Sequence, residues 1–269
     1  MEDRIHLTIA HGVADVMLNR ADKMNALDPA MFRAIAEAGA QLKDARSLRA
    51  VVLSGEGRAF CAGLDVERLT AIAGGESLLP FADLSQRTHG IANYAQHIVW
   101  LWRELPVPVI AAVHGVAFGG GFQLTLGADL RYVAPGTRLS ILETKWGLVP
   151  DMAGTQLMRH LAREDVVREL TYTGRTFSAE EAFAYGFATR LVEDPRAAAM
   201  ATAREIAGRS PDAIRAAKRL LNQAVLCDPR TALIAETIEQ GRLIGSPNQV
   251  EAVTANLEKR PPRFSDAAA

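Results

Sequence analysis

The sequence has few of the features that mark secreted, membrane-spanning or nucleic-acid-binding proteins. Only two of its 269 residues are cysteine, Cys61 and Cys227, and they lie far apart without metal-type spacing. The formal net charge is −1, which gives no long-range attraction to nucleic acid or to an anionic membrane. No apolar run approaches the roughly 20 residues of a membrane span, and the first residues lack the apolar stretch of a signal peptide. We therefore expect a cytoplasmic protein with reduced thiols.

Metal and nucleotide motifs are also missing. The six histidines form no HExxH motif and no Cys/His cluster, so no metal is expected. The phosphate-binding pattern GxxxxGK[ST] does not occur, and no GxGxxG stretch is followed by an acidic ribose partner. A nucleotide-dependent enzyme is thus disfavoured.

Strand-like and helix-like segments alternate in the first half of the chain. Residues 5–12 and 13–19 have β-type patterning around a turn, and residues 49–55 form a short β-branched run. Residues 29–45 repeat apolar side chains at helical spacing, behind Asp28 as N-cap and Pro29 at the first helical position. This order predicts an α/β fold with parallel strands and crossover helices.

Strand signals disappear from about Arg196 onward. The remaining chain reads as four Ala-rich amphipathic helices, three of which open with proline. We therefore divide the chain into a core, residues 1–195, and a C-terminal helical region, residues 196–269. Such helices pack either on their own core or on neighbouring subunits, and the pattern alone leaves both open.

Three consecutive glycines, residues 119–121, follow an apolar strand and open a helix, where each costs up to about 1 kcal/mol relative to alanine. A helix N-terminus offers unpaired N–H groups that a ligand can approach closely when side chains are absent. A second stretch of this kind, GEGRAFCAGLD at 55–65, also lies between a strand and a helix. Two amides from these turns could converge on one oxygen, although glycine-rich turns also occur for packing alone.

Two acids stand in a third stretch that is otherwise apolar or turn-forming. Glu143 and Asp151 are separated by WGLVP, which should fold the chain back. If both carboxyls enter one apolar pocket, their pKa values should rise and split, which suits proton transfer near neutral pH. Alternatively, Glu143 pairs with Arg138 or Lys145, and Asp151 caps the helix that begins near residue 154.

Four stretches in this order resemble the crotonase, or enoyl-CoA hydratase/isomerase, superfamily. They are NRADKMNAL (19–27), GRAFCAGLD (57–65), HGVAFGGGFQLTLGADLRYVAP (114–135) and ETKWGLVPDMAGTQ (143–156). The resemblance implies an α/β spiral of ββα units with a C-terminal helical region. It also implies assembly as a homotrimer or a dimer of trimers.

The resemblance assigns roles to individual positions. It implies an oxyanion hole formed by the backbone N–H groups of Ala62 and Gly120, which would grip the thioester carbonyl of an acyl-CoA substrate. No separate cofactor is implied, because coenzyme A is part of the substrate. The implied substrate and CoA-binding positions are Lys23, Ala26, Leu64, Asp65 and Lys259.

The catalytic positions depart from the hydratase pattern of two glutamates. Gln123 replaces the first, Glu143 matches the second, and Asp151 falls where dienoyl-CoA isomerases of the family place an aspartate. We therefore expect double-bond isomerisation of an enoyl- or dienoyl-CoA. The alternatives are hydration of a 2-trans-enoyl-CoA and an inactive acyl-CoA-binding subunit. Because glutamine cannot transfer a proton, Gln123→Glu should raise any hydratase activity.

Overall fold

A six-stranded sheet forms the centre of the computed structural model, which describes residues 4–79 and 83–267. The strand order is β1-β2-β3-β4-β6-β9, in which β1 and β2 form an antiparallel hairpin and the remaining pairs are parallel. The expected hairpin, helix and strand of the first 55 residues are confirmed. The strands are β1 (Ile5–Ala10), β2 (Val13–Leu18), β3 (Ala50–Gly55), β4 (Val109–Val113), β6 (Leu130–Val133) and β9 (Arg190–Leu191).

A smaller sheet of three strands stands beside the first. It consists of β5 (Val116–Phe118), β7 (Arg138–Ser140) and β8 (Phe177–Ser178), in the order β5-β7-β8. Consecutive strands β4 and β5 enter different sheets, as do β6 and β7, and β5 leads directly into helix α4 (Gly120–Leu126). This ββα arrangement confirms the expected crotonase-type α/β fold.

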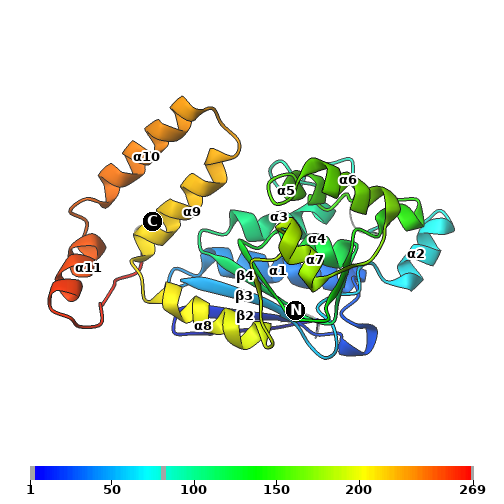
Figure 1. The fold of residues 1–269 in the computed structure, drawn as a ribbon, viewed down its shortest axis with the longest axis horizontal. Helices are drawn as coiled ribbons and strands as arrows, with labels where there is room; N and C mark the ends of the chain where they lie inside the picture. Colours follow the sequence, from blue (N-terminus) through cyan, green and yellow to red (C-terminus); the bar gives the residue numbers. More distant parts are fainter. Residues whose placement is uncertain (1–3, 80–82, 268–269) are drawn as a thin grey trace.

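Helices cover both faces of the large sheet (Figure 1). On one face, α1 (Pro29–Asp44), α3 (Tyr94–Glu104) and α4 enclose the main core, where Phe32, Trp102 and Phe122 are fully buried. On the other face, α8 (Pro195–Ala207) packs Ala199 and Ala203 against the sheet. The predicted cap of α1 is present, since Asp28 accepts a hydrogen bond from the Met31 N–H at 2.7 Å.

Shorter helices surround the carboxyl ends of the central strands. Segment 57–65 leads into one of them at Val66, and segment 143–156 contains one and the start of another. These helices are η1 (Ala21–Lys23), α2 (Val66–Ala73), η2 (Glu143–Trp146), α5 (Gly154–Met158), α6 (Glu164–Thr173) and α7 (Ala179–Tyr185).

The last three helices form an arm that extends away from the sheets (Figure 1). They are α9 (Pro211–Ala224), α10 (Pro229–Leu243) and α11 (Pro247–Leu257), and each has proline in its first turn behind a Ser or Asp cap. Lys218 anchors α9, because its buried ammonium donates to the Trp102 and Val107 carbonyls and pairs with Asp129. None of the helices within residues 4–79 and 83–267 has the length and apolar character needed to cross a bilayer.

Candidate active site

An apolar cavity of about 270 Å³ lies between the glycine turn, the 62–64 loop and the segment after β7. It brings together three stretches that the sequence singled out separately, because Ala62, Gly120, Glu143 and Asp151 all line it. The other lining residues are Phe32, Gly63, Leu64, Val66, Leu69, Ile72, Leu78, Leu84, Phe118, Gly119, Leu142, Trp146, Leu148, Val149 and Met152.

The glycine turn is held tightly between neighbouring loops. Gly119 has φ +50° and ψ −121°, a conformation that side chains disfavour, and its N–H donates to the Ser140 carbonyl at 2.9 Å. A Cβ on Gly121 would lie 2.3 Å from the Cys61 carbonyl oxygen, and one on Gly120 would lie 2.9 Å from Leu27 and Met152 side-chain atoms. The glycines are therefore required by close packing of the turn, as well as by access to its amides.

Among the backbone amides of the cavity wall that have no acceptor in the described part of the protein, two come from the turns at 62–64 and 119–121. They are the N–H groups of Gly120 and Leu64. On either side of Leu64, the Leu27 N–H donates to Gly63 O (2.8 Å) and the Asp65 N–H donates to Leu27 O (3.1 Å). Since amides alternate in direction along an extended segment, the intervening Leu64 N–H faces away from Leu27.

The assignment of Ala62 as a donor is corrected by this geometry. Ala62 lines the cavity, but its own N–H donates to the Met24 carbonyl oxygen at 2.9 Å and is not available to a ligand. Leu64, which the resemblance placed in CoA binding, carries the unpaired amide instead. The sequence singled out this loop but not which of its alternating amides lacks an acceptor.

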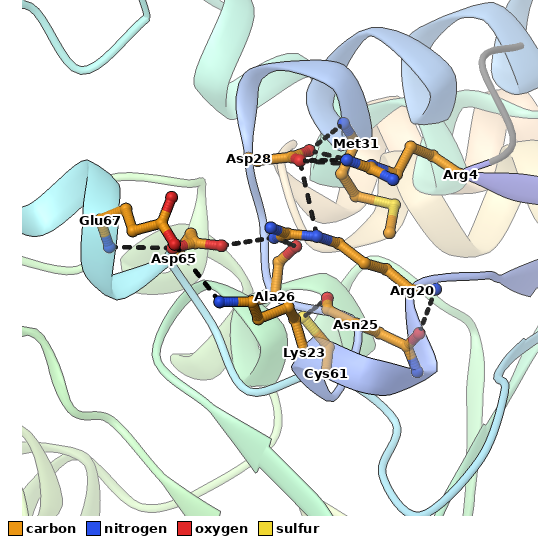
Figure 2. Close-up of polar contacts among 10 residues, drawn as sticks. All are labelled: Arg4, Arg20, Lys23, Asn25, Ala26, Asp28, Met31, Cys61, Asp65 and Glu67. Atoms are coloured by element: carbon orange, nitrogen blue, oxygen red, sulfur yellow. Dashed lines mark hydrogen bonds and ion pairs between the residues drawn. The ribbon is translucent and has the colours of Figure 1, made fainter.

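The loop that carries Leu64 is held by a network of ion pairs (Figure 2). Arg20 donates to the Asp65 carboxylate at 2.5 Å and to the Ala26 carbonyl at 3.2 Å, and its Nε lies 3.6 Å from Asp28. Asp28 is also paired with Arg4, at 2.7 Å. Arg20 thus joins the start of α1 to the start of α2, and sequence analysis missed it although it lies in the quoted stretch NRADKMNAL. Its partner Asp65 is 45 residues away, so no local pattern could reveal the contact.

Asn25 connects the turn that follows β2 to the segment that follows β3. It adopts a left-handed conformation (φ +56°), accepts from the Arg20 N–H through Oδ1, and donates through Nδ2 to the Glu56 and Ala59 carbonyls. The Cys61 thiol donates to the Asn25 carbonyl, and burial raises the pKa of Cys61 to about 12. A thiol with this pKa remains protonated and is a poor nucleophile.

Gln123 lies behind the cavity wall and is buried. Its carbonyl oxygen accepts from the backbone N–H groups of Met152 (2.9 Å) and Gly154 (3.0 Å), which fixes the orientation of the amide. The NH₂ group therefore donates to Glu143 Oε1, at 2.5 Å. Because Gln123 is not among the lining residues, its contact is with Glu143 rather than with a molecule in the cavity.

Glu143 and Asp151 are the acidic groups of the cavity wall. Glu143 is 8% exposed, and its Oε2 is buried without a hydrogen-bond partner in the described structure. Burial raises the pKa of Glu143, and the charge of Asp151 raises it further. Burial also raises the pKa of Asp151. Carboxyls in this state can bind and release protons nearer to neutral pH than exposed ones.

The alternative interpretation of these acids does not hold. The guanidinium of Arg138 lies over the Phe118 ring, 6.0 Å from its centre, and Glu143 has no ion pair among the described contacts. The residue at the N-cap of α5 is Ala153, and no side chain caps this helix. Asp151 therefore does not serve as the cap.

The residues that the resemblance assigned to CoA are only partly brought together. Ala26, Leu64 and Asp65 lie in the loops beside the cavity, but the Asp65 carboxylate is paired with Arg20 and also accepts from the Glu67 N–H. Lys23 is exposed, and its Nζ lies 3.3 Å from Glu67 Oε1. Lys259 follows α11, at the end of the molecule opposite α2 (Figure 1).

A cavity with two unpaired amides and two carboxyls of raised pKa is typical of enzymes that stabilise an oxyanion and transfer protons. The family model described as enoyl-CoA hydratase/isomerase matches residues 8–267. The chain belongs to this enzyme family, and its substrates are accordingly acyl-CoA thioesters.

Relatives and solved structures agree with this assignment. Enoyl-CoA hydratase domain-containing protein 2, mitochondrial, of Bos taurus is 32% identical over 94% of this chain and 84% of its own length. Methylglutaconyl-CoA hydratase, mitochondrial, of Homo sapiens is 30% identical over 94% of this chain and 74% of its own. The crystal structure of enoyl-CoA hydratase from Bacillus anthracis has a TM-score of 0.86 at 30% identity, covering 97% of this chain and 98% of that one. That of enoyl-CoA hydratase from Mycobacterium tuberculosis H37Rv has a TM-score of 0.85 at 29% identity, covering 99% and 100%.

Proposed function

We propose that this enzyme adds water to a 2-enoyl-CoA and forms a 3-hydroxyacyl-CoA. The observation that carries the proposal is that Glu143 and Asp151 line the same cavity as the unpaired amides of Leu64 and Gly120. The sequence alone favoured isomerisation, but the names of the relatives favour hydration. Asp151 can supply the second carboxyl that a hydratase needs and that Gln123 does not provide.

The thioester oxygen would accept hydrogen bonds from the Leu64 and Gly120 N–H groups. One carboxylate of the Glu143–Asp151 pair takes a proton from water as the water oxygen bonds to C3, and the C2–C3 π electrons move to form an enolate. The two amides stabilise the negative oxygen, an effect worth on the order of 10²–10³ in rate for each donor. The protonated carboxyl of the pair then gives a proton to C2. The sum adds one water to the double bond and leaves both carboxyls as they began.

Gln123 supports this chemistry indirectly. Its NH₂ group donates to Glu143 Oε1, which leaves Oε2 as the atom free to exchange a proton. We therefore propose Glu143 and Asp151 as catalytic residues and Gln123 as a positioning residue.

Double-bond isomerisation is the second candidate, and the observation that favours it is Asp151, which lines the cavity and falls where dienoyl-CoA isomerases of the family place an aspartate. In that reaction a carboxylate removes a proton from the acyl chain, the amides hold the dienolate, and a carboxyl returns the proton to another carbon. The third possibility, an inactive acyl-CoA-binding subunit, is disfavoured because both cavity acids are retained with raised pKa values.

We further propose that the subunits form a homotrimer or a dimer of trimers through residues 196–269. Support comes from the apolar side chains that α10 leaves exposed, among them Leu233, Ile234 and Ile238. In such an assembly Lys259 could reach CoA bound to a neighbouring subunit, whereas Lys23 is close to the cavity of its own. A cytoplasmic location remains a prediction, and the mammalian relatives are named as mitochondrial.

Mass spectrometry of products from a panel of enoyl-CoAs tests the reaction. Hydration adds the mass of one water, whereas isomerisation leaves the mass unchanged and moves the double bond. Asp151→Asn and Glu143→Gln should each lower turnover by about 10³-fold. The proposal is wrong if both variants hydrate every enoyl-CoA at the wild-type rate.

A further inference from the structure

Beyond its two carboxyls, the wall of the cavity is almost entirely hydrocarbon. Helix α2 and the segment after it contribute Leu69, Ile72, Leu78 and Leu84, and Phe32 comes from α1. The described lining residues include no Lys, Arg or His, and no Ser, Thr, Asn, Gln or Tyr. Apart from the indole of Trp146, half exposed, no lining side chain in that set carries an N–H group.

Two arginines on and after α2 are engaged elsewhere. Arg68, on α2, donates to the Glu76 carboxylate at 2.9 Å and to the Ser77 carbonyl at 2.7 Å. Arg87 is exposed and its guanidinium donates to the Leu84 carbonyl at 3.4 Å. Neither of these two side chains lines the cavity.

The wall therefore treats neutral and anionic acyl groups very differently. A hydrocarbon chain loses no hydrogen bonds on entry and gains from leaving water. A second carboxylate would lose its water without a cationic partner, and it would enter a cavity whose charged groups, Glu143 and Asp151, are both acidic.

We infer that this enzyme selects uncharged hydrocarbon acyl groups and rejects acyl groups that carry a second carboxylate. The inference rests on the proposed function, since it specifies the acyl part of the same substrate. It is independent of whether the reaction is hydration or isomerisation, because both begin with the acyl chain in this cavity.

Binding of unreactive saturated thioesters tests the selectivity directly. Isothermal titration of the wild-type protein would compare butyryl-CoA, hexanoyl-CoA, glutaryl-CoA and the neutral methyl ester of glutaryl-CoA. We expect each added methylene that becomes buried to strengthen binding about fourfold. Glutaryl-CoA should bind at least about tenfold more weakly than its methyl ester, which has a similar shape but no charge.

A substitution on α2 provides a second test with a matched control. Leu69 is a partly exposed lining residue of a helix without buried residues, so Leu69→Lys places a cation in the wall without disturbing the core. We expect this variant to bind glutaryl-CoA about tenfold more tightly than the wild type, and hexanoyl-CoA more weakly. Leu69→Met should keep the wild-type preference.

The outcomes separate this inference from the proposed function. If glutaryl-CoA binds the wild type as tightly as its methyl ester does, the charge selectivity is wrong, while acyl-CoA binding stands. If hexanoyl-CoA and butyryl-CoA bind no better than free CoA, the cavity does not hold an acyl group, and the proposed function fails with the inference. A Leu69→Lys variant that fails to fold leaves the decision to the wild-type titrations.

Discussion

The core and the C-terminal arm use apolar residues in opposite ways. In the core, Trp102, Phe122 and the strands β3 and β4 are buried, and the buried acids are Glu143, at the cavity, and Asp65, which is paired with Arg20. In the arm, α10 has no buried residue in the described structure, and Leu233 is 61% exposed. The core therefore buries its apolar side chains within one chain, whereas the arm exposes an apolar surface that a single subunit does not cover.

This difference separates chemistry from assembly. The proposed catalytic groups all come from residues 62–151, and the proposed subunit contacts come from the arm. Variants of the two regions should affect different measurements, which gives the following tests.

The largest effect is expected at the cavity acids. Glu143→Gln should lower kcat by about 10³-fold, since general acid–base groups contribute 10²–10⁴-fold. Steady-state kinetics with the best enoyl-CoA of the panel would measure this, and sedimentation should show an unchanged assembly. Lys145→Gln, two residues away and exposed, is the matched control. If both variants lower kcat equally, the loss is not caused by removal of the Glu143 carboxyl.

A substitution in the arm tests subunit association. Ile238→Asp should weaken subunit association by at least about thirtyfold, because charge at a buried contact commonly costs about 2 kcal/mol or more. Sedimentation velocity across a dilution series would detect smaller species, and circular dichroism should show that the core remains folded. Ile238→Leu serves as the control. A wild-type protein that sediments as a monomer at all concentrations would contradict the proposed assembly.

Gln123→Glu is expected to lower turnover by about tenfold, and this reverses the expectation from the sequence. A glutamate there would still accept from Met152 N and Gly154 N, but its other oxygen would face Glu143 Oε1 in place of a donor. Two facing acceptors repel, and the pKa of the pair rises. Kinetic profiles against pH should therefore move to higher pH. An increase in hydration would show instead that this side chain can reach the substrate.

Arg20→Lys should cause a smaller loss, of about three- to tenfold in kcat, with little change in KM. A lysine cannot reach Asp65, Asp28 and the Ala26 carbonyl together, so the loop that carries the Leu64 amide should be less well fixed. Arg4→Lys, which alters the same network without touching Asp65, is the control. If both variants change kcat equally, Arg20 has no special role in positioning that amide.

The smallest effect is a change in stability with pH. Because the pKa values of Glu143 and Asp151 are raised in the folded state, that state holds protons which the unfolded chain has released. The free energy of unfolding should therefore fall as pH rises from the ordinary carboxyl values, 4.5 and 3.8, through the raised ones. Urea unfolding of the wild type and the Glu143→Gln/Asp151→Asn double variant at pH 4.5 to 8 would measure this. The double variant should show a weaker decline, and parallel curves would contradict the pKa shifts.

Local signals predicted much of the fold because their causes are local. Asp28 before Pro29 marked the start of α1, and the prolines near positions 211, 229 and 247 marked three helices of the arm. Glu143 and Asp151 were identified as candidates because acids are unusual in an apolar segment. Their shared cavity required the fold, since α2, α4 and η2 each contribute part of its wall.

The errors at the site have one physical origin. The direction of a single amide depends on which strand it faces, so Ala62 and Leu64 could not be distinguished before the contacts with Met24 and Leu27 were known. Gln123 was expected to face the substrate, but two amides from the segment after β7 turn it toward Glu143. Whether Lys259 reaches CoA depends on neighbouring subunits, which lie outside the single chain.

By itself, the sequence determined the alternation of strands and helices, the helical C-terminus and the candidate stretches for a site, because periodicity, caps and glycine conformations act over a few residues. Only the tertiary structure decided which amides are unpaired, which way Gln123 points, and that both acids share an apolar wall whose described residues include no cation. These properties arise from contacts between residues far apart in the chain, and burial in a common cavity, rather than residue type, sets their hydrogen bonds and pKa values.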